Sequence, residues 1–216
     1  MLRRFTRPVR MATIGATLLA TALGGLAATP VLSAPAAATG NPVTPGNFTG
    51  LGFDQCATPS QTAMSAWLKS SPFRAAGVYI SGNSRACRTQ TNLTATWVAT
   101  QLRSGWHLMP ITLGPQASCS TRFPRYGASI DPTISASTTN TYAAARGQGA
   151  LEAQRAVAAA KALGIVPGST LFYDLEAFNT KSSAACTNSA LWFLGSWTQA
   201  LHRYGCLLYT SPSPRD

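Results

Sequence analysis

The chain has 216 residues, which is enough for one domain with an ordinary hydrophobic core and hardly enough for two. Seventeen basic and six acidic residues give a net charge of +11. The arginines are scattered and no stretch combines aromatic with basic residues, so the composition argues against a nucleic-acid-binding module. The charge favours an anionic partner such as a bacterial wall polymer or lipid headgroups, although solubility alone also explains it.

Residues 1–38 have the composition of a secretory signal peptide. Four arginines precede a segment of small apolar residues, and Ala36 and Ala38 suit cleavage by a signal peptidase. The mature chain then starts near Thr39 with thirteen basic and six acidic residues, a net charge of +7. The alternative is a membrane anchor, but the segment is barely long enough to span a bilayer. We expect a secreted or cell-wall-associated protein with no stable membrane span after cleavage, and a short linker at residues 39–49.

Five cysteines in an exported chain predict disulfides before metal ligands, because no CxxC or HExxH pattern is present. Cys56, Cys87, Cys119 and Cys186 each follow an apolar, strand-like run, whereas Cys206 does not and is expected to be free. Neighbouring loops pair most easily, which favours Cys56 with Cys87 and Cys119 with Cys186, and two other pairings remain open. Neither histidine has a partner at ligand spacing, so we expect no metal and no cofactor.

From residue 47 the chain repeats a unit of apolar run, polar loop and helix. Four such units imply parallel strands with right-handed crossovers, in a (β/α)8 barrel or an open doubly wound sheet. No GxGxxG or GxxxxGK phosphate loop follows any run, and near-continuous apolar runs fit barrel strands. We therefore predict an α/β fold of the (β/α)8 TIM-barrel type with only the first four strand-helix units present. The predicted strands lie in residues 50–56, 75–82, 106–114 and 169–178, and the helices in 58–70, 92–105, 150–168 and 190–205, with Thr58 and Asn92 as N-caps.

Three of the six acidic residues, Asp54, Asp174 and Glu176, lie where predicted strands end. In a parallel barrel the functional side chains gather at these ends. Residues two apart on a strand point the same way, so Asp174 and Glu176 should face the barrel mouth, and Tyr173 and Leu175 the helices. Converging carboxylates are what cleavage of a glycosidic bond requires, one to donate a proton and one to stabilise positive charge at the sugar carbon.

A structural cluster is the alternative explanation of this acidic pair. An arginine such as Arg85, Arg88 or Arg122 would then hold the pair at the strand end. The third aspartate nearby favours function. Four aromatic residues near strand or loop positions could stack on sugar rings, although each taken singly fits a core position better: Tyr79, Trp106, Phe123 and Tyr126.

Seven stretches in order, GFDQCATPS, MSAWLKSSPF, GVYISGNSRAC, NLTATWV, GWHLMPITLG, YDLEAF and FLGSWTQALH, resemble a secreted actinobacterial glycoside-hydrolase-like family of unknown function. The resemblance covers about residues 50–205. That family is similar to family 25 lysozyme-type muramidases in its (β/α)8 barrel, its first-strand aspartate and its later DxE motif. The resemblance implies that Asp54 is the first-strand aspartate, that Asp174 and Glu176 form the DxE, and that Glu176 is the proton donor.

The end of the chain departs from that family. After Gly205 the family continues into a fifth strand, whereas CLLYTSPSPRD follows here. Its turn-rich composition has no place in a barrel strand, so we expect residues 206–216 to be foreign and the barrel to be truncated. The leading function is an exported glycoside-hydrolase-like protein, muramidase-type in its full-length form, acting on peptidoglycan or a related wall polysaccharide. The alternative is a non-catalytic module of the same fold that binds wall glycan.

Overall fold

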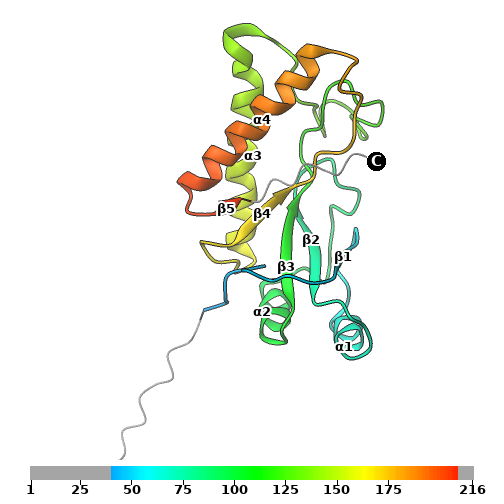
Figure 1. Cartoon of the computed structure of the whole chain (residues 1–216). Helices are drawn as coiled ribbons and strands as arrows, with labels where there is room; N and C mark the ends of the chain where they lie inside the picture. Colours follow the sequence, from blue (N-terminus) through cyan, green and yellow to red (C-terminus); the bar gives the residue numbers. More distant parts are fainter. Residues whose placement is uncertain (1–39, 209–216) are drawn as a thin grey trace, which may run out of the picture. The chain divides into compact units, whose positions relative to one another are not determined.

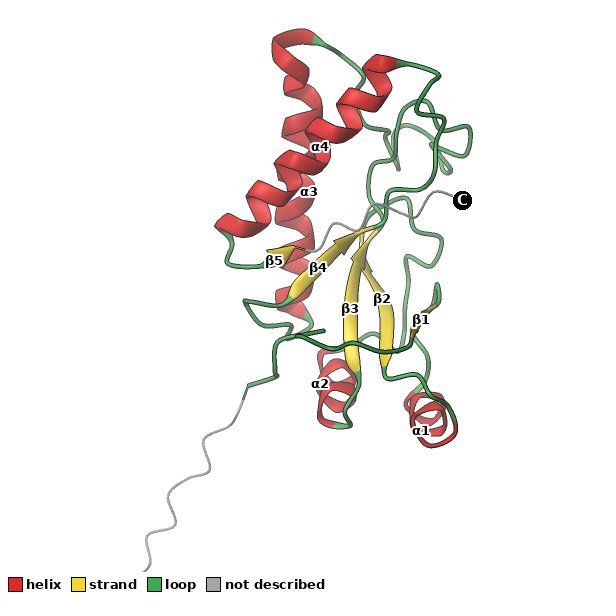
Figure 2. Ribbon diagram, in the orientation of Figure 1, coloured by secondary structure: helices red, strands yellow, loops and turns green. Residues whose placement is uncertain are grey.

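The structure is a computed structural model that describes residues 40–208. Strands and helices alternate along this part of the chain, and the strands form one parallel sheet in the order β1-β2-β3-β4-β5 (Figures 1 and 2). The elements are β1 Gly52–Asp54, α1 Gln61–Ser70, β2 Ala75–Ser81, α2 Ala95–Arg103, β3 His107–Thr112, α3 Thr139–Ala162, β4 Thr170–Tyr173, α4 Ala184–Arg203 and β5 Leu207–Leu208.

The predicted α/β class and the parallel strand-helix units are thus confirmed. The pattern is compatible with part of a (β/α)8 barrel, but within residues 40–208 β1 pairs only with β2 and β5 only with β4. Because all strands run in one direction, their carboxyl ends meet at one edge of the sheet. The loops that follow the strands at this edge hold the polar residues discussed below.

The hydrophobic core lies between the sheet and the helices. Phe193 and Trp197 of α4 are fully buried, and both rings contact Tyr173 of β4 edge-on, at centroid distances of 5.1 and 5.2 Å. Side chains of α1 and α2, such as Met64 and Trp97, belong to the same core. Tyr173 and Leu175 pack against this core, as expected for side chains facing the helices.

Helices α3 and α4 lie side by side (Figure 1). Gly149 allows this close approach, since a Cβ at this position would lie 2.3 Å from the Phe193 carbonyl oxygen. Small residues of α3, including Ala153 and Ala156, are fully buried in the same layer. The small side chains of α3 therefore allow α3 and α4 to pack closely.

Two helices begin later than the N-caps predicted. Ser60 caps α1 and accepts a hydrogen bond from the backbone N–H of Ala63, while Thr94 caps α2 by accepting from Trp97. The hydroxyl of Thr58 instead bonds Gln90 Oε1, at 2.5 Å. The Asn92 amide donates to the Thr58 carbonyl, at 3.0 Å. The side chains of Thr58 and Asn92 therefore connect two loops and do not cap the helices.

The third predicted helix is longer than its alanine-rich run. It starts at Thr139, eleven residues before residue 150, and has left-handed φ values of 49, 55 and 56° at Asn140, Thr141 and Tyr142. These non-helical angles mark a kink near its start. The sequence before Ala150 has no clear helical spacing of apolar residues, so it does not predict residues 139–149 of this helix.

The segment expected to be a linker packs against the sheet. Thr44 is buried, and its hydroxyl both donates to the Leu108 carbonyl and accepts from the Leu108 N–H, each at 2.7 Å. Its carbonyl accepts from Thr170 N at 2.9 Å. Phe48 stacks on His107, with ring centroids 4.3 Å apart. Residues 41–48 therefore join the sheet across the amino-terminal ends of β3 and β4, which their composition does not reveal.

The strand pairing also continues past the expected boundary at Gly205. Thr170 pairs with Leu207 and Leu171 with Leu208, in parallel, and Cys206 is buried. Cys206, Leu207 and Leu208 were expected to belong to a foreign tail. They are apolar, and in the structure they extend the sheet. The predicted signal peptide and most of the predicted tail lie outside the described residues.

Two disulfides join Cys56 to Cys87 and Cys119 to Cys186, which is the pairing favoured from the sequence. Cys206 is the free cysteine of the described residues. Two disulfides are consistent with an extracellular protein. Across residues 40–208, no helix is both long enough and apolar enough to cross a membrane.

Candidate functional site at the carboxyl ends of the strands

The strand ends bring the predicted carboxylates together. Asp54 ends β1 opposite Gly77 of β2, and a Cβ on Gly77 would lie 2.5 Å from the Asp54 Cβ. The glycine therefore leaves room for Asp54 beside β2. Asp174 directly follows β4, and its N–H donates to the Thr112 carbonyl of β3 at 2.9 Å, which continues the sheet ladder by one residue.

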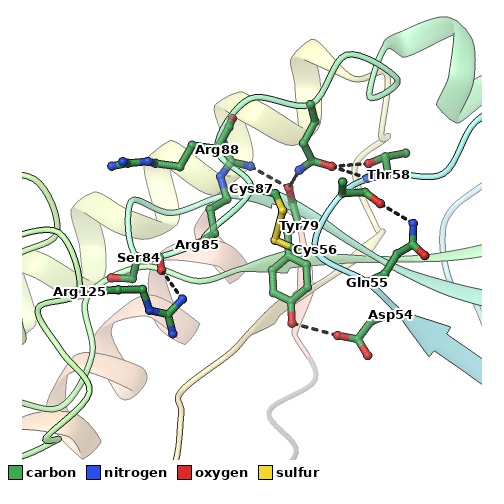
Figure 3. Close-up of a disulfide and its surroundings, with 12 residues drawn as sticks. Asp54, Gln55, Cys56, Thr58, Tyr79, Ser84, Arg85, Cys87, Arg88 and Arg125 are labelled. Atoms are coloured by element: carbon green, nitrogen blue, oxygen red, sulfur yellow. Dashed lines mark hydrogen bonds between the residues drawn. A yellow bond between two sulfur atoms is a disulfide. The ribbon is translucent and has the colours of Figure 1, made fainter.

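Tyr79 of β2 joins two of these carboxylates. Its hydroxyl oxygen lies 3.0 Å from Asp54 Oδ2 and 3.1 Å from Asp174 Oδ2, and Figure 3 shows the ring aimed at Asp54. A tyrosine hydroxyl carries one proton and can donate it to only one carboxylate. Both contacts become hydrogen bonds when one carboxyl group keeps its own proton and donates it to the Tyr79 oxygen.

The surroundings favour Asp174 as that carboxyl group. Burial raises the pKa of Asp174 above its ordinary value, and the Glu176 and Asp54 carboxylates raise it further, against the opposing effects of the Tyr79 hydroxyl and Arg122. Burial and the charges of Asp174 and Asp54 also raise the pKa of Tyr79, which keeps its hydroxyl neutral as a donor. Asp174 is thus more readily protonated than an ordinary aspartate. In its protonated form it can donate to the Tyr79 oxygen while the Tyr79 hydroxyl donates to Asp54.

Glu176 has different surroundings, because two arginines bind it. Arg122 Nη1 contacts Glu176 Oε2, and Arg125 Nη2 lies 3.5 Å from Glu176 Oε1. Glu176 is largely buried, whereas the Arg122 side chain is 60% exposed. Guanidinium groups stabilise the ionised form of a carboxylate. Arg122 was foreseen as a structural partner of the acidic pair, whereas Arg125 was not.

Gln116 is a site residue that sequence reasoning missed. Its buried side chain donates from Nε2 to the Asp174 carbonyl and accepts at Oε1 from the Glu176 N–H, each at 2.8 Å. The same Nε2 also donates to the Gly114 carbonyl, at 3.1 Å. One side chain therefore fixes the backbone on both sides of Leu175 and sets the directions of the two carboxylates.

The arginines stand on a long connection between β3 and α3, where Asp131 fixes one turn. Asp131 is buried, and its carboxylate accepts from the N–H groups of Arg125 and Tyr126, at 2.7 and 2.9 Å. The Arg125 guanidinium lies 4.7 Å from the centroid of the Phe123 ring. Because a charged acceptor holds two backbone donors, this turn presents Arg125 in a defined direction.

The connection between β2 and α2 forms the other wall of the site (Figure 3). Arg85 Nη1 and Gln90 Nε2 both donate to the Tyr79 carbonyl, at 2.7 Å each. Arg125 reaches this connection from the other loop and donates to the Ser84 carbonyl at 3.3 Å. The Cys56–Cys87 disulfide ties the connection to the residues after β1, so three loops meet around Tyr79.

A cavity of about 240 Å³ lies among these groups, lined by the carboxylates Asp54, Asp174 and Glu176 and by arginines that include Arg122 and Arg125. A larger cavity of about 620 Å³ runs along the sheet from Asp54 to residues 45–50. The smaller one holds both kinds of charge and is therefore the candidate site. Among residues 40–208, no group of three or more His, Cys, Asp and Glu side chains is placed to hold a metal ion.

The aromatic residues considered as sugar platforms have other contacts. Trp106 is 2% exposed and packs against Phe53, so it belongs to the core. Phe123 is buried under Arg125, and the Tyr126 ring lies beneath the Arg88 guanidinium, at 4.3 Å. Tyr79 alone of the four lines the cavity, where its hydroxyl is the group in use.

The family model for the Rv2525c-like, glycoside hydrolase-like domain matches residues 65–214. The chain belongs to this glycoside hydrolase-like family. The matched range includes Asp174, Glu176 and both arginines of the site, while Asp54 precedes it. Membership supports a function related to glycans, and it agrees with the glycoside-hydrolase-like family recognised from the sequence motifs.

Among solved structures, the chain is similar to an uncharacterized B. stearothermophilus protein with a 1.07 Å crystal structure, at 17% identity and a TM-score of 0.46. The match covers 76% of this chain and 62% of the other protein. The chain thus spans less than two thirds of that protein's length. No curated protein matches this chain.

Proposed function

We propose that this protein is an exported glycoside hydrolase that cleaves a cell-wall glycan, either peptidoglycan or a related polysaccharide. The observation that supports it best is the convergence of Asp54, Asp174 and Glu176 on one cavity in a member of a glycoside hydrolase-like family. Cleavage of a glycosidic bond needs one carboxyl group that holds a proton and one that is ionised. Burial and neighbouring carboxylates raise the pKa of Asp174, while Arg122 and Arg125 pair with Glu176, so the two carboxyl groups have different surroundings.

The division of roles in this proposal reverses the one that the sequence resemblance implies. Asp174 is the group whose surroundings favour the neutral form, so it would donate the proton to the leaving oxygen. Glu176 would be the ionised group that acts at the sugar carbon. We further propose that the strand-helix units belong to a (β/α)8 barrel like that of family 25 muramidases, and that residues 1–38 direct export.

The decisive experiment uses protein expressed from the complete reading frame and purified cell wall as substrate. Glu176→Gln and Asp174→Asn should each lower the release of soluble fragments by about a hundredfold or more, because each removes an ionisable group while keeping its shape. Glu152→Gln is a matched control, since this carboxylate lies outside the site cavity on α3. Binding to wall in a pull-down should persist in all three variants.

A nitrophenyl glycoside of a wall sugar separates the two roles. Its leaving group departs without a proton, so loss of the proton donor costs little with this substrate. Asp174→Asn should regain most of its activity on it, whereas Glu176→Gln should stay inactive. The opposite pattern would restore Glu176 as the donor.

The arginines around Glu176 favour a second candidate function, a module that binds wall glycan without cleaving it. A carboxylate bonded to Arg122 and Arg125 is not free to act on a sugar ring in this arrangement. If the wild type binds wall but releases no fragments over a range of pH, the binding module is correct and the DxE pair is structural.

A further inference from the structure

On the loop side of the cavity three arginines, Arg85, Arg122 and Arg125, lie near Glu176, while Asp54 and Asp174 stand at the strand ends. Arg122 and Arg125 share the single carboxylate of Glu176, and Arg88 is stacked on Tyr126. Among residues 40–208, the other ion pair joins Arg155 and Glu152 on α3, so Arg88 has no carboxylate partner there. Asp131, the acidic residue nearest in sequence to Arg122 and Arg125, accepts hydrogen bonds from backbone N–H groups instead.

The same loop side leaves one guanidinium donor unsatisfied. Arg85 Nε is buried with no hydrogen-bond partner, and burial together with the charge of Arg88 lowers the pKa of Arg85. Guanidinium groups that are close together and incompletely paired favour an anionic partner. The cavity beside Glu176 is where such a partner could lie, because Arg85, Arg122 and Arg125 all line it.

We propose that Arg122 and Arg125 form a subsite for a carboxylate carried by the glycan, and that this carboxylate takes the place of Glu176 on the arginines. The inference rests on the proposed function and names its substrate class, an acidic glycan. A carboxylate is favoured over other anions because the two arginines already bind one, that of Glu176.

The exchange of partners has a consequence for the site. In the free protein Glu176 is bonded to the arginines, and the largely exposed Arg122 can move with little loss of packing. When a carboxylate of the glycan binds Arg122 and Arg125, Glu176 is released toward the cavity that it shares with Asp174. An acidic substituent would thus both select the substrate and free the ionised group.

Binding can be measured on two glycans that differ only in this charge. One is a soluble, peptide-free glycan strand with free carboxylates, and the other is the same strand with its carboxylates converted to amides. Titration calorimetry at low and moderate salt should show about tenfold tighter binding of the acidic strand, with the difference shrinking as salt rises. The protein is that of the complete reading frame.

Three variants test the assignment to these residues. Arg122→Gln with Arg125→Gln should lose the preference and bind both strands as the wild type binds the amide. Arg103→Gln, an exposed arginine at the end of α2, should keep the preference. Glu176→Gln should bind the acidic strand several times more tightly than the wild type and the amide strand equally well, because the arginines lose their internal partner.

The outcomes separate the subsite from the function. Equal binding of the two strands by the wild type would overturn the subsite and leave glycan binding intact. A preference that survives in the double arginine variant, or a Glu176→Gln variant with no gain, would also overturn it. If neither strand binds, the proposed function fails together with the subsite. Thermal unfolding of each variant confirms that the fold is kept.

Discussion

Asp54, Tyr79 and Asp174 stand at the ends of paired strands, whereas Arg122 and Arg125 stand on the irregular connection between β3 and α3. The first group is held by the sheet ladder, through pairs such as Asp54 with Gly77. The second is held by side chains, chiefly Asp131 and Gln116, and by one disulfide. Sheet hydrogen bonds form a cooperative unit, while a loop depends on a few separate contacts.

This difference matters because the proposed site needs fixed distances between some groups and a change of partner at others. The contact between Asp174 and the Tyr79 hydroxyl requires a fixed distance, and strand ends provide it. The arginines must release one carboxylate and accept another, which is easier on a loop. Substitutions at the disulfides, at Gln116 and at Glu152 test this difference between strand ends and loop.

Removal of the Cys119–Cys186 disulfide should affect the loop side most. In the chain-entropy model, bridges with sequence separations of 67 and 31 contribute about 4.4 and about 3.7 kcal/mol to the free energy of unfolding. The double variant Cys119→Ser, Cys186→Ser should therefore unfold at lower denaturant than Cys56→Ser, Cys87→Ser. Denaturant titrations of the two variants measure this difference.

Hydrogen exchange then shows where each bridge acts. Without Cys119–Cys186, exchange should rise mainly in residues 114–138, which carry the arginines, with β1 to β3 still protected. Without Cys56–Cys87, the rise should be in residues 55–60 and 82–92. Equal loss of protection in both regions would show that loop and sheet form one cooperative unit.

Gln116→Ala should cost about 3 kcal/mol of stability, because it removes the hydrogen bonds that a buried side chain makes to the Asp174 carbonyl, the Glu176 N–H and the Gly114 carbonyl. It should also lower fragment release strongly, since the directions of both carboxylates depend on this side chain. Gln148→Ala is a matched control that loses two similar bonds, to Ser135 N and the Thr133 carbonyl, away from the carboxylates. If both variants lose stability and activity in the same proportion, Gln116 has no special positioning role.

Glu152→Gln should give the smallest effect, and one that depends on pH. Burial raises the pKa of Glu152, with Arg155 and Arg85 opposing the rise. Below about pH 4 the carboxyl is protonated in both the folded and unfolded chain, so wild type and variant should be similarly stable. As pH rises through the folded pKa, the wild type must ionise a buried group and loses stability, whereas the variant does not.

The thermal midpoint of Glu152→Gln should therefore exceed that of the wild type by on the order of 2 °C at pH 8 and approach it at pH 4. Scans at both pH values measure the difference, and all other titrating groups are common to the two proteins. A variant less stable at pH 8 than at pH 4, relative to wild type, would show that Arg155 pairing outweighs burial.

The sequence by its local pattern predicted the main elements and the three carboxylates of the candidate site, Asp54, Asp174 and Glu176. Apolar runs that alternate with amphipathic segments predict a parallel sheet with crossover helices. The observed sheet has this arrangement, with its strands in sequence order. The two-residue period of a strand likewise placed Tyr173 and Leu175 against the core and Asp174 and Glu176 on the other side. The order of the cysteines along the strand-helix units favoured the observed disulfide pairing, although Cys186 lies in the first turn of α4 and not directly after β4.

The contacts that hold the site and set its charge come from the folded arrangement of the loops. Gln116, Arg125 and Asp131 lie in a connection with no periodic pattern, and apart from Gly114 the hydrogen-bond partners of their side chains are 5 to 60 residues away in the chain. The same holds for Thr44, whose hydroxyl bonds Leu108 across 64 residues. The spacing of apolar residues and the turn preferences of single residues can be seen in a short stretch of sequence. Which polar side chain meets which carboxylate depends on distances between loops, and these are fixed only when the sheet has formed.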